Sequence, residues 1–480
     1  MTTLYKYLVA GLLLIGFGAC KKELSALPQN AKVDANTILD QGTAQIALNG
    51  AYYTFANATA VKTGWQMHEV FPARFAGHLT FGVSTGYNED LNLNARTTSY
   101  YWAESYILLN SANGVIKGVT ALADHKFSAN RKQEILAEAR FLRAYAHFKL
   151  LVFYGEWYKV ESPYGVLLRD ELSTLSNIAK ARSSVKESYN FILADLDAVI
   201  ANGPAVNPRH YATKWAGMAL KMRVLMSRGA AGDYAEVVNL ANTLIQTGPY
   251  VLETNARDVF RTAGLTSKEV ILGIIPQVGQ EKATFSKSLQ YWPGASSLYA
   301  ATAALNNLYA NDPRQTWVIG PANPSTRVPN TFFFTKYIAQ STTPTLISEA
   351  SYALRLTEVY LLKAEAIVRS GGSLADAKAL IHTVQEKAGI TSSTNNINYL
   401  AVEAASTPET LLAEIYKETV KSLVAEDGQE WLALLRQPFA TVRQLRHTIT
   451  TQEQYILPVP RSEFMYNPSF GEQNPGYSKN

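Results

Sequence analysis

The sequence predicts a mainly α-helical protein in which pairs of helices support a less regular half with short strands. Apolar residues recur at helical spacing in seven runs, at 131–154, 184–201, 210–228, 233–247, 352–370, 375–388 and 408–426. Between 255 and 350 this spacing is lost, and the prolines at 313, 321, 324, 329 and 344 exclude long helices. We therefore expect helix pairs mainly within 40–250 and 352–430, with an irregular insertion at about 255–350.

The chain begins with a short apolar run that ends in its only cysteine. Lys6 precedes the uncharged residues 7–19, and the small residues Gly18 and Ala19 stand directly before Cys20. This is the pattern of a signal peptide, and the run is shorter than the ~20 residues that span a bilayer. The cysteine resembles that of a bacterial lipoprotein signal. We expect residues 1–19 to be removed, Cys20 to be acylated by fatty acids such as palmitate, and residues 20–480 to form one domain. The alternative is a secretory signal with an incidental cysteine.

Start and stop signals flank the helical runs that follow. Gly155 ends the run at 131–154. Ser184 and Glu187, three residues apart, form a capping box at the start of the run at 184–201. We therefore expect two separate helices here, joined by the stretch between Gly155 and Ser184.

One helix–turn–helix segment repeats further along the chain at an offset of 142. This offset matches Leu220 with Leu362, Lys221 with Lys363, Gly229 with Gly371 and Ala235 with Ala377. Glycine permits a left-handed turn, and a small alanine permits close approach of the second helix. The segments resemble tetratricopeptide repeats, and with the neighbouring runs they predict about four helix pairs. Two unrelated amphipathic hairpins are the alternative.

The remaining stretches predict only short strands. Residues 269–276 (EVILGIIP) form a brief apolar run inside the irregular insertion. Residues 60–102 contain many glycines, asparagines and aromatic residues without a clear period. We expect the minor strand content to come from these two regions.

Composition excludes several functional classes. Net charge is +5 over 480 residues, and no basic block with interleaved aromatic residues is present, so we expect no nucleic-acid binding. A single cysteine, used for acylation, leaves neither a disulfide framework nor a thiol catalyst. Charged residues make up 17 %, below the usual ~25 %, and there are 27 tyrosines. This balance indicates either a surface that contacts a ligand or partner, or an aromatic-rich core.

Motifs of catalysis and metal binding are weak. Residues 82–86 (GVSTG) match the nucleophile-elbow pattern but lack the strand before and the helix after that the elbow needs. His68, Glu69 and His78 do not have the spacing of metal ligands. We therefore predict no catalytic residue, no metal and no cofactor. A helical glycoside hydrolase that uses two carboxylates remains an alternative, because one sequence does not reveal which acidic residues share a cleft.

Five segments between residue 138 and residue 477 carry a further set of motifs. Their residues are Glu138, Arg140, Phe141, Leu142, Arg143, Ala144 and Gly155; Asp312, Pro313 and Arg314; the run 355–366 (RLTEVYLLKAEA); Glu426, Gly428 and Trp431; and Pro458, Pro460, Glu463, Asn467, Pro468, Gln473, Asn474, Pro475, Gly476 and Tyr477. In this order, these segments are similar to the SusD/RagB family of outer-membrane nutrient-binding lipoproteins. We interpret them as fold signatures, with Glu138–Arg143 and Glu358–Lys363 as structural pairs along single helices.

This resemblance implies a SusD-like platform of tetratricopeptide-like pairs and a cell-surface location on the outer membrane through the lipid anchor. It also implies a SusC-like TonB-dependent transporter as partner, to which the protein delivers a captured glycan. A RagB-like peptide ligand is the first alternative. A surface enzyme and a scaffold that binds only proteins are the others.

A glycan site needs exposed aromatic rings for the C–H faces of sugars and polar groups for their hydroxyls. The resemblance implies that loops on the face away from the repeats build it. Two irregular stretches supply such residues: Trp65, Arg74, Phe75, His78, Tyr87, Asn88 and Asp90 in one, and Tyr291, Trp292 and Trp317 in the other. Core packing is the alternative for each aromatic residue.

Overall fold

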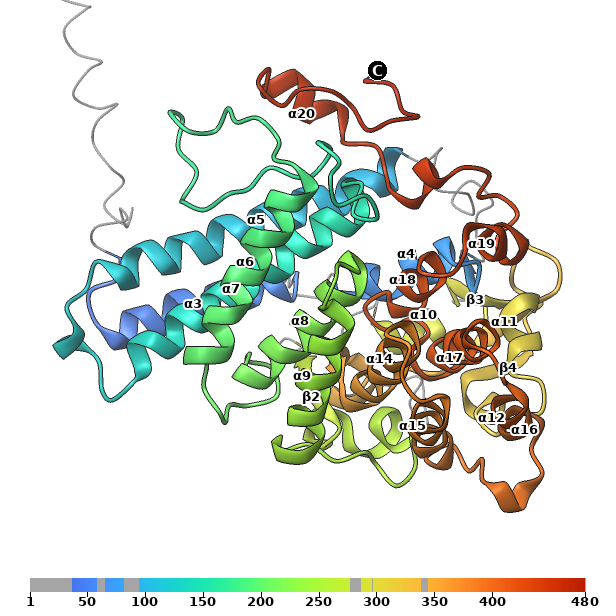
Figure 1. Cartoon of the computed structure of the whole chain (residues 1–480). Coiled ribbons are helices and arrows are strands. Elements are labelled where there is room, and N and C mark those ends of the chain that lie inside the picture. Colours follow the sequence, from blue (N-terminus) through green and yellow to red (C-terminus); the bar gives the residue numbers. More distant parts are fainter. Residues whose placement is uncertain are drawn as a thin grey trace, which may run out of the picture.

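A computed structural model of the chain describes residues 37–57, 65–81, 95–276, 286–295, 297–337 and 344–479. Helices dominate it, and Figure 1 shows α3, α5, α6 and α7 side by side at one end of the molecule. The short helices α11, α12 and α16 and the strands β3 and β4 lie at the other end, whereas β2 lies beside α9 in the middle. The predicted mainly helical fold is confirmed.

Consecutive long helices pack as antiparallel neighbours. They are α3 (Gln41–Phe55), α5 (Ala95–Thr120), α6 (Arg131–Tyr154), α7 (Val185–Asn202), α8 (Lys214–Arg228), α9 (Asp233–Thr247), α14 (Leu356–Arg369), α15 (Leu374–Glu386) and α17 (Pro408–Leu423). Contacts join α3 to α5, α6 to α7, α8 to α9 and α14 to α15, and α9 to α14 across the insertion. These four pairs form the tetratricopeptide-like half.

Shorter helices complete the fold. They are α4 (Gln66–Phe75), α10 (Lys287–Tyr291), α11 (Ala303–Leu308), α12 (Gln315–Val318), α13 (Leu346–Glu349), α16 (Ile397–Ala404), α18 (Gln429–Leu435), α19 (Phe439–Leu445) and α20 (Arg461–Tyr466). Among the described residues, no helix is both long and apolar enough to cross a membrane.

The sequence signals at the helix ends are confirmed. The backbone N–H of Gly155 donates to the carbonyl of Leu151 and ends α6. Ser184 accepts from the backbone N–H of Glu187, whose carboxylate accepts from the backbone of Ser184, so the capping box forms. The run predicted at 352–370 begins as a helix only at Leu356, because residues 351–355 form a strand.

The internal repeat holds in its first helix and turn. Gly229 and Gly371 both adopt left-handed backbone conformations, with φ of +60° and +74°. The expected role of Ala235 is wrong, because this residue is exposed whereas Ala377 is buried. The buried positions of α9, Val237, Ala241 and Leu244, match Ala377, Ile381 and Val384 of α15 at an offset of 140. Four residues separate the two helices in both copies, but α14 has 14 residues where α8 has 15, so the offset of 142 is not kept beyond the turn.

In the described part of the chain, the strands form two small antiparallel sheets. One has the order β1 (Leu79–Phe81), β3 (Tyr299–Thr302), β5 (Thr331–Phe334), β4 (Ile319–Ala322), and the other pairs β2 (Val270–Ile274) with β6 (Ser351–Arg355). The strand predicted at 269–276 is therefore confirmed as β2. All strands come from or directly border the two irregular regions.

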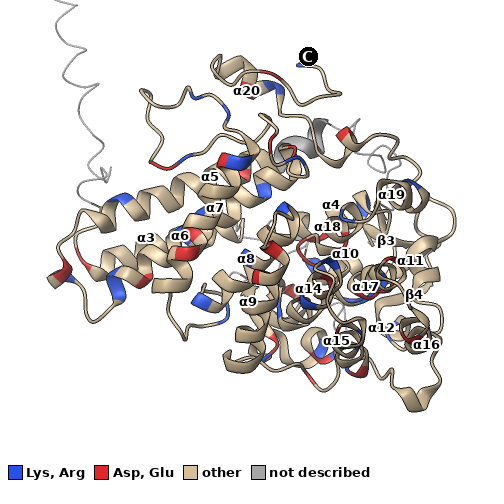
Figure 2. Cartoon of the chain, viewed as in Figure 1, with Lys and Arg blue, Asp and Glu red and all other residues tan. Residues whose placement is uncertain are grey.

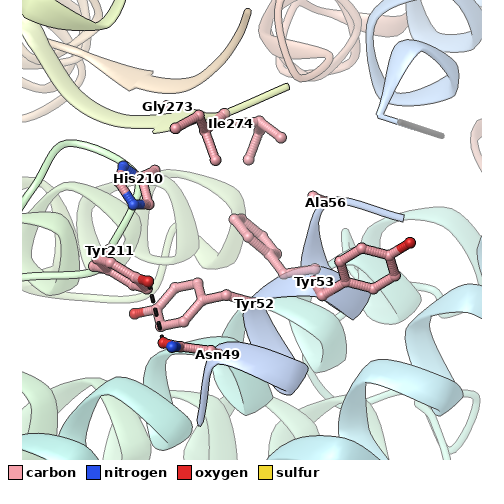
Figure 3. Close-up of a pocket in the computed structure, with 10 residues that line it drawn as sticks. Asn49, Tyr52, Tyr53, Ala56, His210, Tyr211, Gly273 and Ile274 are labelled. Carbon is pink, nitrogen blue, oxygen red and sulfur yellow. Dashed lines mark hydrogen bonds between the residues drawn. The ribbon is translucent and has the colours of Figure 1, made fainter. Parts of the chain in front are cut away.

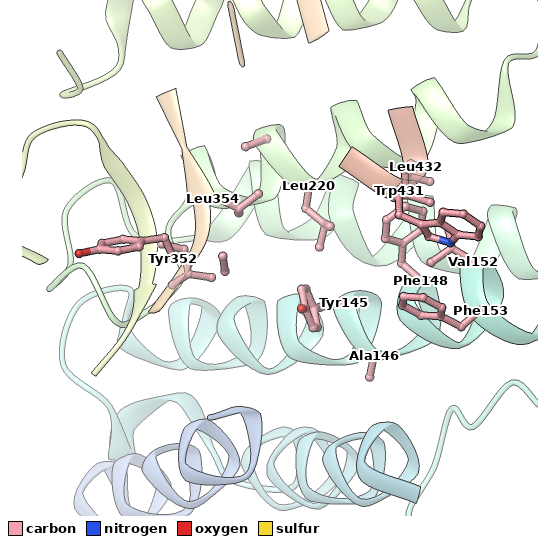
Figure 4. Packing of buried hydrophobic residues seen from close by; sticks show 14 of the residues in the cluster. Tyr145, Ala146, Phe148, Val152, Phe153, Leu220, Tyr352, Leu354, Trp431 and Leu432 are labelled. Carbon is pink, nitrogen blue, oxygen red and sulfur yellow. The ribbon is translucent and has the colours of Figure 1, made fainter. Parts of the chain in front are cut away.

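Aromatic and aliphatic side chains from both halves form one large core. Figure 4 shows Tyr145, Phe148 and Phe153 of α6 near Leu220 of α8, Leu354 of β6 and Trp431 of α18. Trp431 and Phe148 are almost completely buried. Burying such side chains contributes roughly 1.5–3 kcal/mol each, so α6 is the principal internal support of the fold.

Ion pairs are buried beside this core, where Figure 2 shows charged residues of both signs around α14, α17 and α18. Asp427 accepts from Arg223 (2.6 Å), from Lys149 (2.7 Å) and from the hydroxyl of Tyr145 (2.7 Å). Arg223 also binds Glu358. Burial opposes ionisation of Asp427, but Lys149 and Arg223 outweigh it and lower its pKa.

A second buried group links the strand pair β2–β6 to the segment between α17 and α18. Arg355 donates to both oxygens of Glu426 (2.6 and 2.8 Å) and binds Glu269. Lys336 also binds Glu426, and burial lowers the pKa of Lys336 to about 8. Together, Arg355 and Lys336 overcome the effect of burial and lower the pKa of Glu426.

The family-motif residues are thus structural, as interpreted, but the two expected pairs are wrong. Glu138 binds Arg131 and Tyr52, whereas Arg143 binds Asp195 on α7 at 2.7 Å. Glu358 binds Arg223 across 135 residues of sequence, and no ion pair joins it to Lys363. Buried charges favour partners that complete their hydrogen bonds, and these partners lie on neighbouring helices.

The other motifs also hold the fold together. Arg314 binds Asp312 (2.8 Å) and Glu418. The side-chain amide of Asn474 donates to the carbonyls of Tyr154 and Leu457, each at 2.9 Å. This fastens the C-terminal segment to the end of α6.

Candidate ligand-binding site

The sheet brings the two predicted aromatic stretches together. In the β1–β3 pair, Leu79 lies opposite Ala301 and Phe81 opposite Tyr299. The backbone N–H of Thr302 donates to the carbonyl of His78 at 3.0 Å. Residues that are more than 200 positions apart therefore lie side by side in this sheet, where the half-buried ring of Phe81 packs on the buried ring of Tyr299 at 5.7 Å.

Most of the predicted site residues that the structure describes support this region from inside. Trp65 and Tyr291 are fully buried, and Arg74, Phe75 and His78 are less than a tenth exposed. Trp65 stacks on His68 at 4.4 Å, and Tyr291 packs against Phe334 and Tyr337. These side chains pack in the core, so a ligand at the surface does not reach Trp65 or Tyr291.

The two other tryptophans are half-buried but lie at different strands. Trp292 directly follows α10, which contacts β3. Trp317 belongs to α12 next to β4, and its ring stacks on Phe260 at 5.7 Å. Trp292 is therefore the predicted tryptophan that lies beside the β1–β3 pair. Tyr87, Asn88 and Asp90 lie outside the described residues.

An aromatic pocket that sequence reasoning missed lies between α3, the loop before α8 and β2 (Figure 3). Its volume is about 260 Å³. Tyr52 and Tyr53 of α3, His210 and Tyr211 of the loop, and Ile274 of β2 contribute to the lining. The adjacent pairs Tyr52–Tyr53 and His210–Tyr211 were the available signal, but pairing them required the fold.

Hydrogen bonds hold one wall of this pocket in place. The hydroxyl of Tyr52 donates to Glu138 (3.0 Å) and accepts from the backbone of Ala212 (2.7 Å). The hydroxyl of Tyr211 donates to Asn49 at 3.1 Å, as drawn in Figure 3. Burial lowers the pKa of His210, which favours the neutral form of its ring. No charged side chain is among the described residues that line the pocket, which suits an uncharged ligand with hydroxyl groups.

His68 and Glu69, which belong to the motifs considered for chemistry, are both buried. Burial lowers the pKa of His68 to about 3, and Glu69 binds Lys287 at 2.6 Å. The described part of the chain contains no group of three or more His, Cys, Asp or Glu side chains placed to hold a metal ion. Residues 82–86 lie outside the described ranges.

The structure is that of a helical-repeat protein with a pocket lined by aromatic side chains. A family model described as "Starch-binding associating with outer membrane" matches residues 21–226, and a model of the "SusD family" matches residues 280–437. The chain therefore belongs to the SusD/RagB family, as the sequence motifs predicted.

Individual relatives are distant in sequence but close in fold. A SusD-like protein of Bacteroides ovatus is 24 % identical over 56 % of this chain, and the match spans about half (49 %) of that protein. The crystal structure of a SusD superfamily protein from Bacteroides thetaiotaomicron covers 91 % of this chain and 100 % of its own, with a TM-score of 0.73 and 20 % identity. A structure named "Laminarin binding SusD-like protein" covers the same shares with a TM-score of 0.73 and 19 % identity.

Proposed function

We propose that this protein is a cell-surface lipoprotein that captures a glycan and delivers it to a SusC-like TonB-dependent transporter of the outer membrane. Its membership of a family whose matched model is described as starch-binding and associated with the outer membrane carries this proposal. The likeness to a laminarin-binding SusD-like protein over most of the chain supports a glycan as the ligand. The task is capture and transfer, and it requires no catalysis.

We place the glycan site at the β1–β3 pair, around Trp292. Phe81 and Trp292 are the half-buried aromatic residues there, and the stretch that contains Tyr87, Asn88 and Asp90 follows β1 directly in sequence. Sugar rings stack their C–H faces on such side chains, while the neighbouring polar residues bind hydroxyls. Arg74, Phe75 and His78 hold the surface from beneath.

Trp292→Ala is expected to weaken glycan binding by about 1 kcal/mol or more, because a stacked ring is lost. Tyr53→Ala in the pocket at α3 is the matched comparison, since both rings are partly exposed and neither lies in the buried ion-pair groups. Isothermal calorimetry with a laminarin and starch oligosaccharide panel measures both variants. Binding that is lost in Tyr53→Ala and kept in Trp292→Ala would transfer the site to the pocket at α3.

The same panel, extended with a set of peptides, distinguishes the classes of function. Depletion of an oligosaccharide without product supports capture. Appearance of shortened products supports the alternative of a surface glycoside hydrolase, and binding of peptides in place of all glycans supports a RagB-like role. Binding of neither class contradicts nutrient capture and favours a protein scaffold.

Anchoring by Cys20 is the second part of the proposal. Cys20→Ser should release the protein from membranes into the soluble fraction, because no other cysteine is available for acylation. Fractionation followed by a high-salt wash measures this, and a Lys22→Ser chain, which keeps Cys20, is the control. A Cys20→Ser protein that stays with the membranes contradicts the anchor.

A further inference from the structure

An apolar groove lies between α3 and α5, on the repeat half of the molecule. It has a volume of about 600 Å³. Small residues leave room for the groove between the helices. They are Ala47 and Gly50 on α3 and Gly114 and Gly118 on α5, and Leu172 also lines the groove. Replacing water with apolar groups in a groove of this kind is favourable, so the groove favours an occupant.

The described chain begins inside this groove. Thr37 and Ile38 line it, and Ile38 packs so closely on Gly118 that a Cβ atom there would lie 2.6 Å from the isoleucine side chain. The next residue, Leu39, accepts from Lys126 through its carbonyl at 2.7 Å, which fixes the chain as it enters α3. The residues directly before Thr37 therefore start at the groove itself.

Length and chemistry match the segment that precedes Thr37. The groove follows α5 from Ser111 to Ala121, about 15 Å at 1.5 Å per residue. Four or five extended residues cover this distance at about 3.3 Å each. Residues 33–36 read Val-Asp-Ala-Asn, which offers apolar and small side chains for the groove. Its one acid, Asp34, is opposite in charge to Lys117, which lines the groove.

We propose that residues 33–36 dock in the groove between α3 and α5 and clamp the tether to the body of the protein. The docked segment leaves residues 21–32 as the free tether, which reaches at most about 40 Å at full extension. This consequence for reach rests on the proposed lipid anchor, whereas docking itself does not.

Blocking the groove tests the proposal. Gly50→Leu places a side chain in open space within the groove, since nothing lies within 4 Å of the added Cβ, and it removes a helical glycine. Gly42→Leu on the exposed side of the same helix is the matched control. In a Cys20→Ser background, trypsin cleavage after Lys32, normalised to cleavage after Lys22, is followed by mass spectrometry.

We expect Gly50→Leu to accelerate cleavage after Lys32 by about tenfold and Gly42→Leu by less than about twofold, because cleavage reports the open fraction of the segment. Equal rates in the parent and Gly50→Leu overturn the proposal.

A disulfide pair gives a second, independent measurement. The Cys20→Ser background lacks cysteine, so Asp34→Cys with Lys117→Cys should oxidise within one chain. Asp34→Cys with Lys186→Cys, an exposed lysine of α7, should stay reduced. Failure of the first pair to oxidise overturns docking, and disulfides formed only between chains overturn it in favour of a second copy as the occupant.

Discussion

Arg355→Ala is expected to lower the free energy of unfolding by about 3–5 kcal/mol, because it leaves buried carboxylates without their cation. Arg355 is 3 % exposed and joins Glu426 to Glu269. Lys336 still pairs with Glu426 in the variant, so most of the lost stability comes from Glu269, which is left without its cation. The free energy of unfolding of Arg355→Lys should fall between those of the parent and Arg355→Ala, because lysine keeps the positive charge but loses the bidentate hydrogen bond to Glu426.

Urea denaturation followed by circular dichroism measures this loss. Lys186→Ala is the control, because Lys186 pairs with Glu161 at 3.2 Å in an exposed position where water screens the charges. A midpoint shift for Arg355→Ala no larger than that of Lys186→Ala would contradict a structural role for this motif arginine.

The helices that could be predicted from the sequence are those whose pattern is local. The run at 131–154 coincides with α6, and the capping box of Ser184 and Glu187 marks the start of α7. By contrast, α3 and α5 went unpredicted. Residues 95–102, the first turns of α5, read as part of an aromatic and polar stretch without a period, and the packing of α5 between α3 and α6 is what makes this stretch helical.

Partners of buried charges were beyond local reasoning. Spacing along one helix suggested that Glu138 pairs with Arg143. Instead, the guanidinium group of Arg143 donates two hydrogen bonds to the carboxylate of Asp195, 52 residues away. The candidate site shows the same limit. Trp65 stands in an irregular stretch that resembles a binding loop, yet its ring fills the core beside Phe55 and Tyr145. Only the β1–β3 pairing revealed that the two predicted stretches lie next to each other.

Glu430 makes stability depend on pH in a direction opposite to that of an ordinary carboxylate. Burial raises its pKa from near 4.5 to about 8 in the folded protein. Between these values the folded state retains a proton that the unfolded state has released. Stability from this group is therefore complete below about pH 4.5 and falls by up to about 1.4 kcal/mol per pH unit as the pH rises toward 8.

Glu430→Gln should remove this dependence, because the amide resembles the protonated acid and its oxygen can still accept from the backbone N–H of Ala425 (2.9 Å in the parent). Denaturation of both chains from pH 5.5 to 7.5 measures the difference in unfolding free energy. Burial also raises the pKa of Glu138, to about 7. Glu138 titrates in both chains, so its contribution to the free energy of unfolding cancels in the difference. We expect Glu430→Gln to gain stability relative to the parent as the pH rises. A constant difference over this range would mean that Glu430 is already ionised in the folded protein.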